Sequence, residues 1–406
     1  MDSLITAAAR ALAQGDVLAA LKRVALRNDA PALALRGIAM AQLGDFERAK
    51  ALLQGAVQAF GAKEVVARAR CVVALAEIAL VSRDLHWPSR TLENAREVLE
   101  ARQDHLNSAH ARLLQVRRLV LVGQLDDAQR KMGELDPSPL TPVLRAAYEL
   151  TAAGIAIRRI RATAAEAALE RAKKAAHAAG IGALVAEIDA AASGLEAPAA
   201  RLIARGVDRP LALAEVENLI RSDAVVVDAC RRIVRCGKTI VSLSRRPVLF
   251  ALARSLAEAW PHDVPRSVLV ARAFRGRQAD ESYRARLRVE IGRLRRILRS
   301  VARIQATEAG FALLTRRLTD VAVLALPFEG DNAALLALLS DGESWSSSAL
   351  GLALGASQRT VQRGLDSLAK AGKVQTFGRG PARRWTAPAL AGITTTLLLP
   401  ASFPND

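Results

Sequence analysis

The spacing of apolar residues predicts a helix in the stretch 280–299, whose sequence is DESYRARLRVEIGRLRRILR. At about 100° per residue, five apolar or aromatic positions fall within one arc of roughly 80°. An arc this narrow places one face of a helix on a small core and leaves the rest of its circumference in solvent. The five positions are Tyr283, Leu287, Ile291, Leu294 and Leu298.

The opposite face of this predicted helix is basic. The stretch holds seven arginines within sixteen residues, and Arg286, Arg293 and Arg296 point away from the core arc, together with Val289. Arginine suits a surface that faces DNA, because its planar fork can make two hydrogen bonds to a phosphate or to the O6/N7 edge of guanine. We therefore predict a DNA-recognition helix. The simpler alternative is an arginine-rich face that is only solvated surface.

The flanks of this helix follow an order that is typical of one family. Short β-branched runs separated by turn-like breaks predict a small antiparallel sheet over 224–243. Helices are predicted over 246–260 and 265–274, and a hairpin over 304–313. Sheet, three helices and hairpin in this order, from 223 to 317, resemble the OmpR/PhoB-type winged-helix domain. The specific matches are Val226-Val227-Asp228, Gly237-Lys238 before Leu243-Ser244, Ile291-Gly292-Arg293-Leu294-Arg295-Arg296, and Gly310-Phe311-Ala312-Leu313.

The resemblance implies roles for individual side chains. Glu290 and Gly292 depart from the pattern, because many relatives carry polar or basic residues there. Glu308 lies near the tip of a short hairpin without basic residues, so minor-groove contact by this module is not expected. The DNA contacts that the resemblance implies are Arg286, Val289 and Arg293 on bases, Arg295 on phosphate, and Arg296 on the same face.

The first 200 residues are dominated by alanine, leucine and charged helix formers, which predicts an all-α region. A phrase recurs in it at 14–20, 43–49 and 122–128: a glycine, a polar residue or two, and then an alanine. The glycine supplies a turn between antiparallel helices, and the alanine lets them approach closely. The fullest copy, 37–56, resembles a tetratricopeptide repeat, which implies a solenoid that binds peptides or proteins or joins subunits. The region lacks the βα alternation and acidic cluster of a receiver domain, so control by phosphorelay is not expected.

A second group of three helices follows a linker-like stretch, 327–332. Helices are predicted over 333–340, 347–354 and 357–371, with Ser357 placed to cap the last of them.

The last of these helices has its own core arc, made of Val361, Leu365 and Leu368. The segment 349–363 resembles the helix-turn-helix of many bacterial regulators. It has a small residue inside the second helix, a glycine at the turn and Ser-x-Arg-Thr-Val at the start of the third helix. The DNA contacts that this resemblance implies are Ser357, Gln358, Arg359, Gln362 and Arg363.

Two short strands, 373–377 and 383–386, are predicted to flank a basic hairpin tip. Such a tip can lie along a minor groove or a phosphate backbone, so Arg379 and Arg383 are predicted to contact the DNA backbone. An alternative use of the same fold is a protein dock or a dimerisation block. The tail 393–400 could add a strand or take part in dimerisation.

The charge of the chain is concentrated toward its C-terminal half. The stretch 221–386 holds 29 of the 58 basic residues but only 14 of the 40 acidic ones, and so carries most of the net charge of +18. This asymmetry favours a polyanionic partner for that half. No apolar run approaches the roughly 18 to 20 residues that a membrane-spanning helix needs, so no membrane partner is expected. The acidic N-terminus does not resemble a secretion signal, and we expect a cytoplasmic, nucleoid-associated protein.

The sequence offers no candidate catalytic or metal site. The three cysteines are too few and too irregularly spaced for a disulfide framework or a four-ligand zinc site. Cys230 and Cys236 could form a redox pair across a hairpin, although packing as small apolar residues is the simpler interpretation. The histidines are scattered, and no Gly-rich loop, H-E-x-x-H or G-x-S-x-G occurs. We expect a protein that is not an enzyme and that needs no cofactor or metal.

Together these patterns predict a mainly α chain. An α-helical repeat solenoid of tetratricopeptide type (1–205) is followed by two winged-helix (α+β) domains (221–318 and 331–390), with a connecting helix over 205–221. The predicted function is that of a bacterial-type, sequence-specific DNA-binding transcription regulator whose repeats bind an effector or protein or hold subunits together. Expected partners are double-stranded DNA, RNA polymerase or a peptide or protein on the repeats, and a second copy of the chain in a homodimer. The alternative is a repeat-based scaffold whose basic winged helices bind protein partners or nucleic acid without sequence choice.

Overall fold

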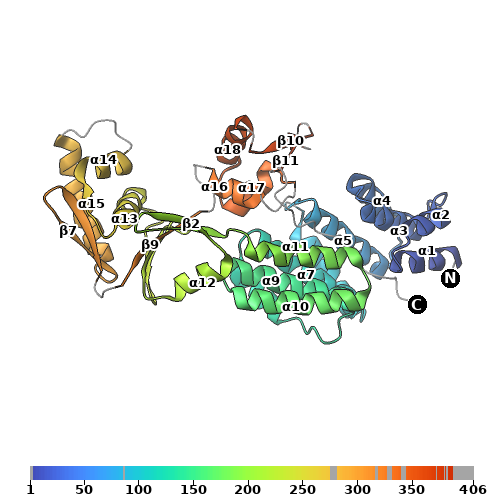
Figure 1. Ribbon diagram of the computed structural model, residues 1–406. Helices are drawn as coiled ribbons and strands as arrows, with labels where there is room; N and C mark the ends of the chain where they lie inside the picture. Colours follow the sequence, from blue (N-terminus) through green and yellow to red (C-terminus); the bar gives the residue numbers. More distant parts are fainter. Residues whose placement is uncertain are drawn as a thin grey trace. The chain divides into compact units, whose positions relative to one another are not determined.

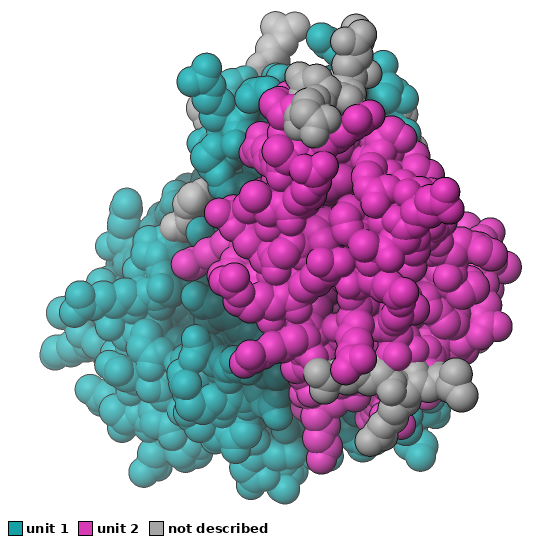
Figure 2. All heavy atoms as spheres, turned by 90° about the vertical axis from the view of Figure 1, so that its left-hand side faces the viewer, with its two compact units in different colours: residues 1–159, 163–194, 334–406 teal, residues 160–162, 195–333 magenta. Residues whose placement is uncertain are grey.

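The structure is a computed structural model, and it divides into two compact units, coloured separately in Figure 2. The helical unit comprises 1–159, 163–194 and 334–406, and the sheet unit comprises 160–162 and 195–333. The described residues are 3–85, 87–274, 281–315, 319–326, 332–339, 344–371, 373–378, 380 and 383–386.

A succession of helices makes up the N-terminal part of the chain, and Figure 1 labels most of them. Within it, Ala49, Leu53 and Ala56, which belong to the stretch 37–56, are fully buried between neighbouring helices. The helices are α1 (Ser3–Ala13), α2 (Val17–Val24), α3 (Ala30–Gln42), α4 (Phe46–Ala59), α5 (Val65–Val81), α6 (Ser89–Ala101), α7 (His105–Leu121), α8 (Leu125–Gly133), α9 (Pro142–Arg158), α10 (Ala162–Ala179) and α11 (Gly182–Glu196).

The turns after α1, α3, α5, α6 and α7 share one backbone geometry, which we call the repeated turn. In each, one residue adopts a positive φ, and the next donates its N–H to the carbonyl five residues earlier. The recurring glycines of the sequence account for three of these turns, but Arg83 and Gln103 take the glycine position in the other two, with φ of 53° and 60°. The N–H to carbonyl pairs are Asp16 to Ala11, Asp45 to Met40, Asp84 to Ala79, Asp104 to Leu99 and Gln124 to Leu119.

The last described elements, 333–386, form a C-terminal module whose hydrophobic core is continuous with side chains of the N-terminal helices. Trp345 and Trp385 are each 1% exposed, and they exchange two backbone hydrogen bonds of 2.8 Å. The predicted core positions Val361, Leu365 and Leu368 are buried. The elements are α16 (Ala333–Leu339), α17 (Ser347–Leu354), α18 (Gln358–Lys370), β10 (Gln375–Phe377) and β11 (Arg384–Thr386).

The sheet unit contains a six-stranded sheet of order β2-β1-β9-β3-β4-β5, in which only the β3–β9 pair is parallel. The hairpins β3–β4 and β4–β5 match the small sheet predicted over 224–243. The other three strands were not predicted. The strands are β1 (Ala200–Ala204), β2 (Val207–Leu211), β3 (Val225–Asp228), β4 (Ile233–Cys236), β5 (Thr239–Ser242) and β9 (Val321–Ala325).

The prediction of a connecting helix over 205–221 is wrong for the first half of that range. Helix α12 (Leu213–Arg221) occupies the second half only, and residues 207–211 form β2 at the edge of the sheet. Pro210 lies inside this strand, and a proline is tolerated there because an edge strand has one side without a ladder partner. The all-α region accordingly ends before Ala200, where β1 begins.

Three helices and a three-stranded sheet complete the sheet unit. Helix α13 (Pro247–Ala259), β6 (Val264–Pro265), α14 (Arg266–Phe274), α15 (Glu281–Leu298), β7 (Ala302–Ala306) and β8 (Gly310–Thr315) follow one another. The three helices and the hairpin β7–β8 match the predicted elements, whereas β6 was not predicted. A Cβ at Gly310 would lie 1.8 Å from the carbonyl oxygen of Val264, so only glycine allows β8 to approach β6 this closely.

The described chain as a whole is mainly helical with smaller sheets, which confirms the predicted class at this level (Figure 1). Among the described residues, every helix is too short or too polar to cross a membrane.

Candidate nucleic-acid interface

Helix α15 is held to its own unit by the apolar face that the sequence indicates. Leu287, Ile291, Leu294 and Leu298 are each at most 1% exposed and belong to one core cluster with residues of α13, α14 and the two sheets. Tyr283 is partly buried against the same core, and its ring centroid lies 5.8 Å from the ring centroid of Phe274. The buried face fixes the rotation of the helix, and therefore fixes which side chains face solvent.

The outward face of α15 carries the predicted DNA contacts. Arg286, Arg293, Arg295 and Arg296 are all exposed. Val289 is 55% exposed although it is apolar, so packing does not explain its place among the arginines. An exposed valine on a basic helix face can contact a thymine methyl group in a major groove.

Neighbouring groups orient these arginines. The guanidinium carbon of Arg286 lies 4.7 Å from the centroid of the Phe274 ring. Arg293 Nη1 lies 2.8 Å from Glu290 Oε1, in a pair that leaves the arginine side chain 60% exposed. Arg295 Nε donates to the carbonyl oxygen of Ile304 at 2.9 Å. These contacts reduce the side-chain entropy that the arginines would lose on binding a partner.

A groove of about 530 Å³ runs between the outward face of α15 and the start of α13. Its cations are Arg293, Arg296 and Arg246, and its one carboxylate is Glu290. Arg246 is the N-cap residue of α13 and makes no side-chain cap hydrogen bond there. Sequence analysis missed Arg246, because nothing in the local pattern places the start of α13 beside α15. The groove is lined by Arg246, Pro247, Val248, Leu249, Glu290, Arg293, Arg296 and Ile297.

The hairpin β7–β8 is short and its tip is not basic. Arg266 donates to the carbonyl oxygens of Glu308 at 2.7 Å and of Thr307 at 3.0 Å, which ties the tip to the start of α14. Glu308 is exposed at this tip. A carboxylate at the tip repels phosphate, so the hairpin adds nothing to the basic face of α15.

The C-terminal module presents a second exposed helix face. Ser357 accepts a hydrogen bond from the N–H of Thr360 and caps α18, as predicted. Arg359 and Arg363 are exposed and Gln362 is half-buried, which agrees with the predicted outward face. Gln358 donates to Ser347 Oγ at 3.3 Å and so spans the turn between α17 and α18.

The hairpin β10–β11 places the cation Arg383 next to this face. The guanidinium carbon of Arg383 lies 4.3 Å from the centroid of the Trp385 ring, and Arg383 Nη2 lies 3.8 Å from Asp366 Oδ1. Gln362 donates to the same carboxylate at 3.1 Å. The predicted contact Arg379 lies outside the described residues.

The cysteine, histidine and acidic side chains of the described residues are the groups that a metal or thiol site would use. Among the described residues, no group of three or more His, Cys, Asp or Glu side chains could hold a metal ion. Burial raises the pKa of the Cys71 thiol to about 12, so this thiol stays protonated and unreactive at neutral pH. The three cysteines are free, so Cys230 and Cys236 are not bonded to each other.

No protein-family model, no curated protein and no solved structure matches this chain.

Proposed function

We propose that the chain is a sequence-specific DNA-binding transcription regulator, and that α15 is its principal recognition helix. The observation that carries the proposal is the division of α15 into two faces. On one face, the side chains from Leu287 to Leu298 that pack on the core are each at most 1% exposed. The other face exposes arginines around Val289. A solvated surface helix needs no such concentration of one kind of cation, whereas a helix lying in a major groove does.

The order of elements supports a winged helix of OmpR/PhoB type for this unit. Strands β3–β5 precede α13, α14 and α15, and the hairpin β7–β8 follows them. In such a domain the third helix lies in the major groove and the hairpin lies beside it. Arg286, Val289 and Arg293 then contact bases, while Arg295 and Arg296 contact phosphate or the groove edge. Arg246, at the far side of the groove beside α15, is an additional phosphate contact in this proposal.

The C-terminal module is proposed to be a second winged helix. Arg359, Gln362 and Arg363 on α18 would contact DNA, with Arg383 on its backbone. The helices α1–α11 are proposed to form a tetratricopeptide-like repeat that binds an effector or a protein, or that joins two copies of the chain. We place the protein in the cytoplasm, on the nucleoid.

One observation favours a different use of the C-terminal module. The core cluster of this module includes Leu85, which is 2% exposed. Leu121 and Val122 of the helical region pack against this cluster. A winged helix that packs on its own chain can serve as a protein dock, as the scaffold alternative requires. DNA binding by the sheet unit does not depend on which use holds.

The test is selection of binding sites from random and genomic DNA by the full-length protein, followed by titration at several salt concentrations. A regulator should enrich one defined sequence and bind it at least about 1,000-fold more tightly than random DNA. The logarithm of its affinity should fall linearly with the logarithm of salt concentration, with a slope set by the number of phosphates contacted. Equal affinity for all sequences would support the scaffold instead.

A further inference from the structure

One copy of the repeated turn differs from the others. After α1, α3, α6 and α7 the next helix begins directly behind the turn, at Val17, Phe46, His105 and Leu125. After α5 the turn at Arg83 and Asp84 is followed by four extra residues, 85–88, before α6 begins at Ser89. Leu85 and Trp87 belong to this insertion, so two large apolar side chains stand where the other repeated turns have none.

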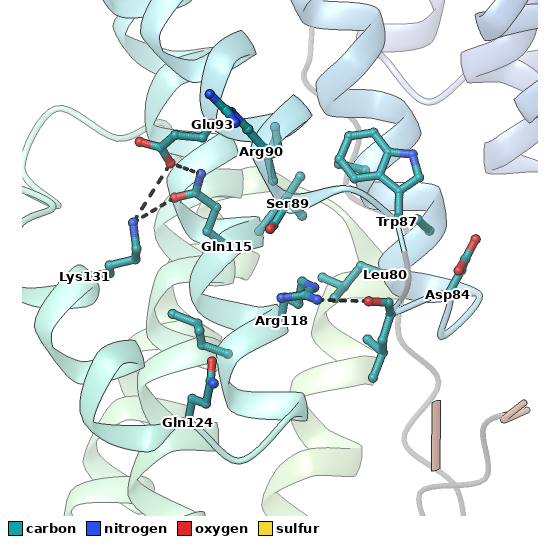
Figure 3. Close-up of a pocket in the computed structure, with 16 residues that line it drawn as sticks. Leu80, Asp84, Trp87, Ser89, Arg90, Glu93, Gln115, Arg118, Gln124 and Lys131 are labelled. Carbon is teal, nitrogen blue, oxygen red and sulfur yellow. Dashed lines mark hydrogen bonds and ion pairs between the residues drawn. The ribbon is translucent and has the colours of Figure 1, made fainter. Parts of the chain in front are cut away.

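Leu85 and Trp87 of this insertion line one side of a pocket of about 420 Å³ between α5, α6 and α7 (Figure 3). This volume is within the range of small-molecule sites, roughly 300–1,000 Å³. Much of the wall is apolar, and the indole of Trp87 lies at its edge. The apolar lining residues are Ala76, Ala79, Leu80, Leu85, Trp87, Leu92, Leu114 and Leu119.

The polar part of the wall holds more cations than anions. Arg90, Arg118 and Lys131 line the pocket, against Asp84 and Glu93. Glu93 is already engaged by Arg96, which lies outside the lining, at 2.9 Å, and Lys131 Nζ lies 4.0 Å from Glu93 Oε2 (Figure 3). Burial by itself would raise the pKa of Glu93, but hydrogen bonds from Arg96 and Gln115 outweigh burial and hold that pKa below its usual value. The charge of Glu93 is therefore balanced by Arg96 and Lys131. Of the other charged lining residues, Arg90 and Arg118 face one carboxylate, Asp84, which leaves room for one acidic group of a ligand.

Arg118 lies in the middle of the pocket and is the cation best placed to receive that group (Figure 3). Its Nη2 donates to the carbonyl oxygen of Leu85 at 3.0 Å. Its Nε is buried and has no hydrogen-bond partner among the described residues. A guanidinium that protein acceptors satisfy only in part is a site for a carboxylate.

Leu85 links the pocket to the C-terminal module. It lines the pocket, and it also belongs to the core of that module together with Trp345, Leu350 and Leu365. Two residues earlier, the guanidinium carbon of Arg83 lies 5.3 Å from the centroid of the Trp345 ring. Any ligand that draws Arg118 away from Leu85, or that presses on Leu85, therefore acts on a side chain that the C-terminal module needs.

We propose that this pocket binds a small amphipathic carboxylate, and that its occupancy changes the packing of the C-terminal module through Leu85. The apolar body of the ligand lies against the leucine and alanine wall and Trp87, and its carboxylate lies at Arg118 with Lys131 nearby. A single negative charge fits better than a phosphate, because Asp84 and Glu93 dilute the positive field. The inference concerns ligand binding and does not require the DNA-binding proposal.

The test compares three probes with the same apolar body: octanoate, octylamine and octanol, each titrated calorimetrically into the full-length protein. Octanoate should bind at one site per chain, and octylamine and octanol should bind at least tenfold more weakly. Arg118→Met should weaken octanoate binding at least tenfold, while Arg112→Met, a substitution on the same helix outside the pocket, should not. Lys131→Met gives a second variant if Arg118→Met does not fold.

Amide hydrogen exchange tests the link to the C-terminal module without any DNA. Saturating octanoate should change the exchange of α18 and leave the exchange of α15, which packs on the core of the other unit, unchanged. Absence of octanoate binding, equal binding of octylamine, or binding that both cation variants leave intact would overturn the site. Binding with unchanged exchange in α18 would overturn the link.

Discussion

The two candidate DNA-binding regions differ in what holds them together. Helix α15 rests on a large core made entirely within the sheet unit. Helix α18 rests on a smaller core that includes Leu85 from the insertion after α5. Their hairpins differ too, because the tip after β7 carries Glu308 whereas β11 is preceded by Arg383. A helix that packs on a core within its own unit needs no other part of the chain to hold its surface in place. A helix that packs on a shared core can be regulated through the segment that shares that core.

The largest expected effect tests the shared core. Leu85→Ala should destabilise the C-terminal module by about 2–5 kcal/mol, because it removes a buried side chain and leaves a cavity. Amide exchange in α18 should accelerate accordingly, while exchange in α15 stays unchanged. Leu53→Ala is the matched control, since Leu53 is fully buried in a different core cluster of the helical unit. Equal exchange of α18 in both variants would show that the module has an independent core.

The next effect concerns DNA affinity. Arg293→Ala should weaken binding to the selected sequence by about 1–3 kcal/mol and relax the preference at one base pair. Arg363→Ala should cost less, because α18 exposes fewer arginines than α15. Arg209→Ala is the matched control, since Arg209 is also an exposed arginine in an ion pair, with Glu215 at 2.7 Å, but lies in β2. A greater loss from Arg363→Ala than from Arg293→Ala, measured by fluorescence anisotropy, would reverse the ranking of the two helices.

A smaller effect tests the cap of α18. Ser357→Ala should cost about 1 kcal/mol, because the N–H of Thr360 loses its acceptor at the helix start. Ser367→Ala, an exposed position on the same helix, should change stability by less than about 0.5 kcal/mol. Amide hydrogen exchange in α18 measures the stability of this module in each variant. Similar losses in the two variants would mean that the cap contributes nothing to the module.

The smallest effect concerns the one carboxylate in the groove beside α15. Glu290→Gln removes the ion pair with Arg293 and a charge that repels phosphate, so affinity for all DNA sequences should rise by roughly two- to fivefold. The preference for the selected sequence should fall slightly, because Arg293 is less well oriented. A drop in affinity for random DNA would place Glu290 away from the phosphates.

Local periodicity was sufficient to predict the helices of the candidate sites and their orientation. The arc from Tyr283 to Leu298 fixed which face of α15 is buried, and Ser357 marked the start of α18. Both rest on contacts within one or two helical turns, which the order of residues along the chain contains directly. The DNA contacts themselves stay predictions, because a buried face locates an exposed one without naming its partner.

Only the tertiary structure decided the rest. Strand β9 pairs in parallel with β3, far away in the sequence, and its uniformly apolar run has no periodicity to distinguish it from other buried segments. The repeated turn at Arg83 was not recognised in the sequence, because its positive φ is maintained by the surrounding fold and not by a glycine. The pocket at Arg118 and the shared core at Leu85 arise from helices and an insertion that meet only after folding. Such sites depend on long-range packing, which no local pattern records.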